Sequence, residues 1–149
     1  MKQSGKQRMS SQKVQGRCLC GDIAYEIDGN LGIFQYCHCS RCRKFTGSSH
    51  AANLLVSPDQ FHWLQGESQV IQFEPEDTQH FATAFCPRCG SSMPWLGKTK
   101  KAVVVPAGTL SSHPHIEPMQ NIFWDSRADW YTSVDALPKY ATLPNKGSQ

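Results

Sequence analysis

Cys37-His38-Cys39-Ser40-Arg41-Cys42 is the stretch that decides the fold of this chain of 149 residues. Two further groups of closely spaced thiols accompany it, Cys18-Leu19-Cys20 and Cys86-Pro87-Arg88-Cys89. Thiols two or three positions apart can bind one soft cation, and zinc is the first expectation. Seven cysteines do not fill two closed tetrahedra, so the count predicts four plus three ligands. One site is then closed and structural, and the other keeps a fourth position for water or a ligand.

Two other uses of the cysteines have less support in the sequence. Disulfide bonds suit a secreted domain, but the N-terminal residues hold no apolar stretch that would serve as a signal peptide, and an odd number of thiols leaves one unpaired. A redox pair at Cys86 and Cys89 should lie where a strand leads into a helix, and Gly90-Ser91-Ser92-Met93-Pro94 does not begin a helix. Zinc binding is therefore the preferred interpretation.

Length and charge indicate one domain between two polar tails. The formal charge of +3 is uneven, because residues 1–17 hold five basic residues and no acid, which leaves ten basic and twelve acidic residues in 18–149. We expect a disordered basic leader over residues 1–15, one zinc-binding domain over 16–143 and a flexible tail over 144–149. The apolar run Ala102–Val105 is far too short to cross a membrane. Thiol-rich metal sites suit a reducing compartment, so we expect a cytoplasmic protein.

Short apolar runs separated by turns occupy the domain. This pattern predicts a mostly β fold of short antiparallel sheets, with at most one or two helical turns, expected over Ser40–Phe45. The expected strands are Ile23–Ile27, Leu31–Tyr36, Ala51–Val56, Phe61–Leu64, Gln69–Phe73, Phe81–Phe85 and Ala102–Val105. Gly21 and Gly90 each follow a cysteine pair, where a metal-binding turn requires a positive φ or a close backbone approach.

Three motifs carry a resemblance to a known family. They are GRCLCG at Gly16–Gly21, CHCSRCRKFTGS at Cys37–Ser48 and FCPRCGS at Phe85–Ser91. In this order, and together with Gly108-Thr109-Leu110, Trp130 and Ala136-Leu137-Pro138, they resemble the glutathione-dependent formaldehyde-activating enzyme and centromere protein V family over about residues 16–143. The resemblance implies a β-tent fold stapled by two zinc ions per chain.

The resemblance also implies which residues serve each site. Cys18, Cys20, Cys86 and Cys89 would close the structural site, and Cys37, Cys39 and Cys42 would hold the catalytic zinc. The implied activity is the reversible addition of glutathione to formaldehyde by a carbon–sulfur lyase, in which zinc lowers the pKa of a bound thiol. Nearby guanidinium groups would pair with substrate carboxylates, and nearby hydroxyls would donate to a developing alkoxide. The expected substrate contacts are Arg41, Arg43, Thr46 and Ser48.

A second hypothesis is a zinc-stabilised adaptor that binds a protein or a nucleic acid without catalysis. The basic leader favours it, because clustered cations bind phosphate. Against it, residues 1–17 hold no aromatic side chain for stacking on a base, and residues 18–149 carry two more acids than bases. We therefore expect a small thiol and a small aldehyde as partners, with no membrane and no nucleic acid.

The remaining histidines and tryptophans have less specific expectations. His38 lies between two of the clustered cysteines and should point away from an ion that both face, so a surface or supporting role is preferred to a ligand role. His113 and His115 flank Pro114 and are expected to be solvated. The tryptophans are expected in the core or in a pocket wall rather than in a stacking platform, and they are Trp63, Trp95, Trp124 and Trp130.

Overall fold

The computed structural model describes residues 12–145, and in this part of the chain short strands dominate and one α-helix is present. The elements are β1 (Lys13–Arg17), β2 (Ala24–Asp28), β3 (Ile33–Cys37), α1 (Ser40–Thr46), β4 (Ala51–Val56), β5 (Phe61–Gln65), β6 (Ile71–Phe73), β7 (Thr83–Phe85), β8 (Trp95–Leu96), β9 (Val103–Pro106) and β10 (Gln120–Ile122). Single 3-10 turns lie at Pro58–Gln60, Glu67–Gln69, Ala107–Thr109, Trp124–Ser126 and Val134–Ala136. The predicted mostly β fold with one short helix is confirmed. No helix within residues 12–145 is long and apolar enough to span a membrane.

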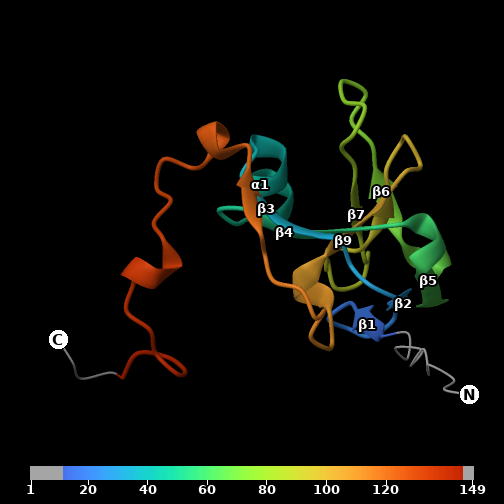
Figure 1. Cartoon of the computed structure of the whole chain (residues 1–149), viewed down its shortest axis with the longest axis horizontal. Coiled ribbons are helices and arrows are strands. Elements are labelled where there is room, and N and C mark those ends of the chain that lie inside the picture. Colours follow the sequence, from blue (N-terminus) through green and yellow to red (C-terminus); the bar gives the residue numbers. More distant parts are fainter. Residues whose placement is uncertain (1–11, 146–149) are drawn as a thin grey trace, which may run out of the picture.

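Three small sheets make up the body of the protein. The first has the order β1-β2-β5, the second β10-β3-β4-β9-β8, and the third is the pair β6-β7. All pairings are antiparallel except that of β10 with β3, which is parallel. In Figure 1 the strands gather in one body, and the C-terminal segment, coloured orange to red, leads away from it.

The main apolar core is built by the alternating buried residues of three strands. β2 contributes Tyr25 and Ile27, β4 contributes Leu54, and β9 contributes Val105, all fully buried. These positions follow the two-residue period of a strand, and branched side chains pack well on its pleated surface. A second buried cluster surrounds the outer cysteines, and its members are Cys18, Ile23, Ala82, Ala84, Cys86, Met93 and Trp95. One pair of thiol motifs is therefore part of the core.

The predicted leader was too long at its C-terminal end. Residues 13–15 belong to β1, whose buried and exposed residues alternate and whose Val14 side chain is buried. Lys13 pairs with Glu26 of β2 across the strand pair, with 3.2 Å between Nζ and Oε1. Lys13, which the sequence assigns to a disordered leader, lies on the solvent face of this edge strand. Residues 1–11 and 146–149, which hold the rest of the expected leader and most of the expected tail, lie outside the described residues.

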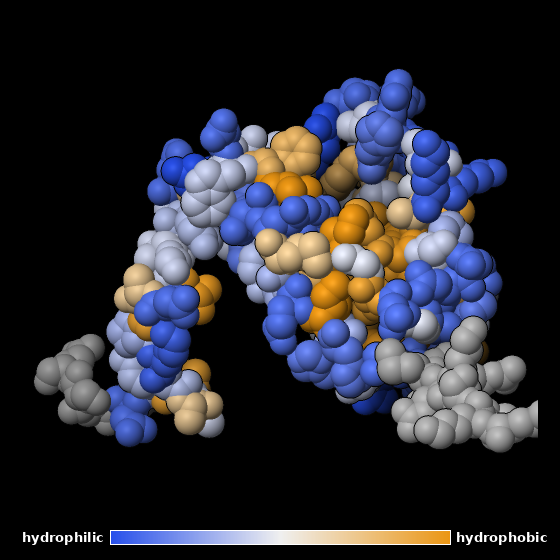
Figure 2. All heavy atoms as spheres, in the orientation of Figure 1, coloured by the Kyte–Doolittle hydropathy of each residue, from blue (hydrophilic) through white to orange (hydrophobic). Residues whose placement is uncertain are grey.

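After β10 the chain forms an arm, defined here as residues 132–145. Every residue of the arm is exposed, although it carries large apolar side chains such as Leu137 and Tyr140. Its backbone hydrogen bonds are local: the Ala136 amide donates to the Ser133 carbonyl, and the Leu137 amide donates to the Val134 carbonyl. Figure 2 shows apolar side chains on this segment as well as in the middle of the body. The functional site described below lies in the body.

Candidate functional site

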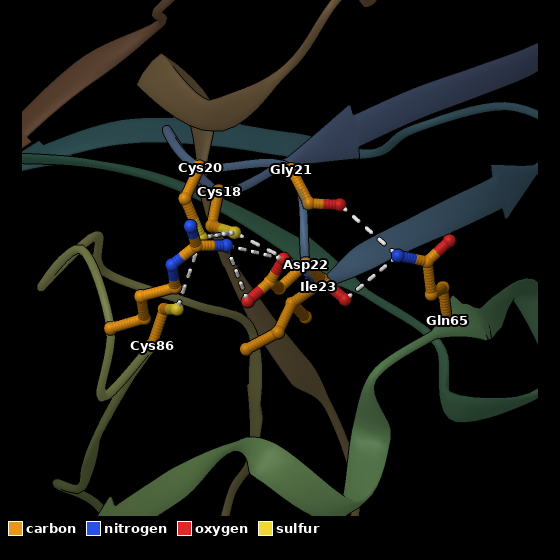
Figure 3. Close-up of polar contacts among 8 residues, drawn as sticks. Cys18, Cys20, Gly21, Asp22, Ile23, Gln65 and Cys86 are labelled. Carbon is orange, nitrogen blue, oxygen red and sulfur yellow. Dashed lines mark hydrogen bonds and ion pairs between the residues drawn. The ribbon is translucent and has the colours of Figure 1, made fainter.

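The first thiol cluster joins two turns that are distant in sequence. Cys18 and Cys20 lie in the turn between β1 and β2, and Cys86 and Cys89 lie in the turn after β7. The four sulfur atoms lie within 4.8 Å of one another. The Sγ atoms of Cys18 and Cys20 are 3.5 Å apart, and those of Cys20 and Cys86 are 3.8 Å apart. Figure 3 shows Cys18, Cys20 and Cys86 converging on one point.

Two glycines shape these turns. Gly21 and Gly90 have φ values of 83° and 76°, a left-handed conformation that other residues adopt only with strain. The Gly21 amide donates to the Cys18 carbonyl at 3.1 Å, and the Gly90 amide donates to the Cys86 carbonyl at 2.8 Å. Each hydrogen bond closes a tight turn that brings its two cysteines onto the same side. The positive φ expected from the sequence is present at both positions.

The cluster fits a tetrahedral zinc ion by its donor set and its spacing. Zinc with sulfur ligands at about 2.3 Å places those sulfurs about 3.8 Å apart, close to the two separations above. The buried Ile23 amide donates to Cys18 Sγ at 3.3 Å, as expected beside a sulfur that carries negative charge. Hydrogen bonding with the side chain and backbone of Ser91 lowers the pKa of the Cys89 thiol to about 5, which favours the thiolate that a metal binds.

Side chains outside the cluster hold the first turn in place. Arg88 donates through Nη1 to both carboxylate oxygens of Asp22, at 3.1 and 3.2 Å, and so ties the two cysteine turns together. The Gln65 side chain at the end of β5 donates to the Gly21 and Asp22 carbonyls at 3.2 and 3.0 Å, as Figure 3 shows. The turn is therefore fixed from two sides by residues that bind no metal themselves.

The second cluster comes from one short segment. Cys37 is the last residue of β3, Cys39 is the N-cap of α1, and Cys42 is in the first turn of that helix. Their sulfurs lie within 4.8 Å of one another. The Cys42 amide donates to Cys39 Sγ at 3.3 Å, so the same sulfur caps the helix. Gly47 ends the helix in the left-handed conformation, with φ of 62°.

Cys37 and Cys42 differ in how readily each thiol loses its proton. A hydrogen bond from the Cys42 thiol lowers the pKa of Cys37 to about 6, and the same contact raises the pKa of Cys42. The contact therefore favours the thiolate at Cys37 over the thiolate at Cys42. Three sulfurs from one strand end and one helix turn fit a soft cation and leave a coordination position for another ligand. Both clusters could therefore bind a metal ion.

A cavity of about 560 Å³ opens beside the second cluster. Cys37, Cys39 and Cys42 form part of its wall, together with apolar residues of β4, β8 and β9. The segment of residues 77–82, between β6 and β7, forms another part of the wall. The first cluster does not contribute to this wall. The cavity therefore connects the three thiols, and not the four, with a space for a ligand.

The polar residues expected to contact a substrate divide into two groups. Arg41 and Thr46 line the cavity, whereas Arg43 and Ser48 are not among the residues of its wall. Arg41 pairs with Asp77 at 3.2 Å, so its charge is already compensated. The Thr46 hydroxyl donates to the Cys42 carbonyl at 2.8 Å, so its proton is already used.

His38 is fully buried, so the surface role considered for it is wrong. Its Nε2 atom forms a 2.8 Å hydrogen bond with Oδ1 of Asn121 in β10. Trp124 and Tyr131 pack edge-on against its ring. His38 therefore fastens the C-terminal part of the chain to the end of β3, where Cys37 lies.

The tryptophans do not share one environment. Trp95 is buried and lines the cavity, and Trp63 is half-buried beside the core, as expected. Trp124 and Trp130 are 41% and 68% exposed, so the expectation of a core or wall position is wrong for them. The sequence reasoning did not identify Asp77 or Phe81 as residues of the cavity wall. Their neighbours gave no signal, because the segment 74–81 has neither a metal-ligand spacing nor a strand pattern until Phe81.

Comparisons with known proteins agree with this description. Residues 13–126 match the family model described as glutathione-dependent formaldehyde-activating enzyme. The match includes both thiol clusters and ends before the arm. A crystal structure of a Rhodobacter sphaeroides protein is similar in fold, with a TM-score of 0.56 and 17% sequence identity, and the match covers 72% of this chain and 98% of that one. No curated protein matches the chain. Because the family model covers most of its length, the chain belongs to the glutathione-dependent formaldehyde-activating enzyme family.

Proposed function

We propose that this protein is a zinc-dependent carbon–sulfur lyase that adds a small thiol, such as glutathione, to formaldehyde or a related aldehyde, and catalyses the reverse reaction. The observation that carries the proposal is the position of the three-thiol cluster in the wall of a cavity, away from the closed four-thiol cluster. The family description supports the reaction class. The free thiols and the absence of any redox step suit a reducing compartment such as the cytosol.

Two zinc ions with different duties follow from the two clusters. The four thiols Cys18, Cys20, Cys86 and Cys89 would hold a structural ion, because they leave no coordination position. Cys37, Cys39 and Cys42 would hold the catalytic ion. When bound there, zinc lowers the pKa of a substrate thiol and keeps the resulting thiolate in place. The protein's own part is to hold three sulfurs on one side of the cavity and to leave the other side for the aldehyde.

The reaction requires no oxidant or reductant. The substrate sulfur attacks the carbonyl carbon of the aldehyde, a C–S bond forms, and the π electron pair of the carbonyl moves to oxygen, which then takes a proton. The Thr46 hydroxyl already donates to the backbone, so another donor is needed for that oxygen. Asn53 of β4 lines the cavity, and its neighbour two residues earlier, Ala51, is paired with Cys37. Side chains two apart on a strand share a face, so the Asn53 amide is on the side of the sulfurs and is our candidate donor.

Exchange NMR tests the proposal directly. In a mixture of glutathione and formaldehyde, the zinc-loaded protein should accelerate exchange between free formaldehyde and its glutathione adduct, above the rate without protein. Cys42→Ser should remove the acceleration, and Asn53→Ala should reduce it by about 100-fold to 1000-fold, the range for one oxyanion donor. Ser48→Ala is the matched control, because Ser48 is near the cluster in sequence but is not in the cavity wall. Equal exchange with and without the protein would reject the function.

A further inference from the structure

The size of the cavity does not correspond to formaldehyde. At about 560 Å³ it falls within the range of sites that bind metabolites and drug-sized molecules. Formaldehyde contributes one carbon and one oxygen to an adduct and would leave most of this space to water. A larger electrophile, or a larger group on the adduct, would fill it.

The wall of the cavity is mainly apolar and rigidly supported. Phe45 of α1, Phe81 and Trp95 of β8 contribute aromatic faces, and Leu55 of β4 and Val104 of β9 contribute aliphatic ones. The rings of Phe81 and Trp95 pack edge-to-face with their centroids 6.3 Å apart. Trp95 is 8% exposed and belongs to the core, so this surface exists before any ligand arrives. Contact with such a surface offers water few hydrogen bonds, whereas burial of an apolar group against it is favourable in free energy.

The charges on the wall do not suit an anion in the cavity. Among residues of the types Lys, Arg, Asp and Glu, the wall contains Arg41 and Asp77, and these two pair with each other at 3.2 Å. Lys98 is near the segment 77–82 but donates to the Pro75 and Thr78 carbonyls, at 2.8 and 2.6 Å, and is not in the wall. Three thiolates add negative charge on the opposite side. An anionic group inside would meet that charge without a free cation to compensate it.

We propose that the cavity selects an uncharged apolar electrophile, an aromatic or branched aliphatic aldehyde, in preference to formaldehyde. The inference rests on the proposed function, since it names the second substrate of that reaction. The thiol's charged end stays outside the cavity in solvent, and the carbon chain of the aldehyde lies against Phe81 and Trp95. The carbonyl carbon then meets the substrate sulfur, and the C–S bond forms with the same balance of atoms as above.

Binding of two matched probes to the zinc-loaded protein tests this preference without turnover. Benzyl alcohol is uncharged and benzoate is an anion of similar size, and quenching of tryptophan fluorescence or calorimetry can measure both. We expect benzyl alcohol to bind at least about 10-fold more tightly than benzoate, because burial of an uncompensated charge is costly. Tighter or equal binding of benzoate, or no binding of benzyl alcohol, would overturn the inference.

Wall variants connect the binding to this cavity. Leu55→Phe adds volume on the cavity face of β4 and Phe81→Ala removes an aromatic face, and each should weaken binding of benzyl alcohol by about 5-fold to 10-fold. Asp77→Asn releases Arg41 and should strengthen benzoate alone. Glu76→Gln is its matched control, an exposed neighbour that is not in the wall, and should change neither probe. Unchanged benzyl alcohol binding in both wall variants would place the probe elsewhere and overturn the inference.

The exchange assay separates this inference from the proposed function. Competition between benzaldehyde and formaldehyde for the same thiol should favour benzaldehyde by about 10-fold or more in catalysed rate per unit concentration. Accelerated exchange of formaldehyde with no preference for benzaldehyde would leave the proposed function intact and reject the apolar electrophile. Tight benzyl alcohol binding with no accelerated exchange of either aldehyde would reject the lyase and support the selectivity of the cavity.

Discussion

Loss of one thiol should have very different consequences in the two clusters. Cys86→Ser removes a ligand that joins residues 66 positions apart, because its sulfur lies 3.8 Å from that of Cys20. The loop-entropy relation for a cross-link over such a distance gives about 4 kcal/mol of stabilisation. Cys42→Ser acts on a cluster whose ends are five residues apart, and the same relation gives about 2 kcal/mol.

Packing increases the difference between the two variants. Cys86 is fully buried and belongs to the core cluster that also contains Ile23 and Met93. Cys42 is also buried, but it packs in a smaller cluster beside the cavity. Because domains of this kind are stable by about 5–15 kcal/mol, loss of about 4 kcal/mol should remove between about a quarter and most of that stability, so Cys86→Ser should unfold at a much lower urea concentration than the wild type. Cys42→Ser should fold and lack one zinc ion.

Urea unfolding followed by circular dichroism, together with metal content measured by mass spectrometry, checks this prediction. Excess chelator added to the wild type should reproduce the instability of Cys86→Ser, since metal binding and folding are one equilibrium at the closed site. An equal loss of unfolding free energy in both variants would refute the division into a structural and an open site. A wild type that unfolds identically with and without chelator would refute it as well.

Two further predictions concern the first sheet. A Cβ atom on Gly16 would lie 2.3 Å from the ring of Tyr25, which is buried and hydrogen-bonded to Thr109. Gly16→Ala should therefore lower the free energy of unfolding, measured in urea, by about 1–3 kcal/mol or more. Gly32→Ala is the control and should be nearly neutral, because the space around Gly32 is open. Hydrogen bonding to Gln15 and pairing with Lys13 lower the pKa of Glu26, so the stability that this carboxylate contributes is present above its ordinary pKa near 4.5 and is lost as pH falls through the lower folded value. Thermal unfolding between pH 6 and 3 should therefore show a smaller loss for Glu26→Gln than for wild type, and identical pH profiles would contradict this role.

The sequence predicted best those structural features that depend only on residues close together in the chain. The cysteine spacings indicated the two groups of thiols, and the glycines after them have the positive φ that was expected. The strand over Ala51–Val56 has the predicted bounds, because its apolar run ends at Ser57-Pro58. The helix predicted over Ser40–Phe45 extends one residue further, to Thr46, where Gly47 ends it. In each case the residues themselves restrict the backbone.

Features that depend on distant partners were missed. The bond of His38 to Asn121 spans 83 residues, and β10 is recognisable as a strand only because β3 lies beside it. The cavity is lined by α1, by residues of β3, β4, β8, β9 and β10 and by the segment 77–82, so no local pattern could show that Arg41 would face Asp77. The sequence placed cations near the three thiols and predicted a site for an anionic substrate. Asp77, in the distant segment 77–82, pairs with Arg41 and compensates the charge of that cation.

The two clusters differ in how they depend on the fold, and this difference has a functional consequence. The closed cluster requires that two distant turns meet, so it forms only in the folded chain and stabilises that chain when it binds metal. The open cluster is prepared locally, by the end of β3 and the cap of α1, which His38 and Asn121 fasten to the rest of the sheet. In the proposed function, a substrate would therefore enter and leave the open cluster without disturbing the core. The segment 77–82 connects β6 to β7 and forms part of the cavity wall, and connecting segments tolerate sequence change better than strands do, so we expect changes of substrate within this architecture to arise there.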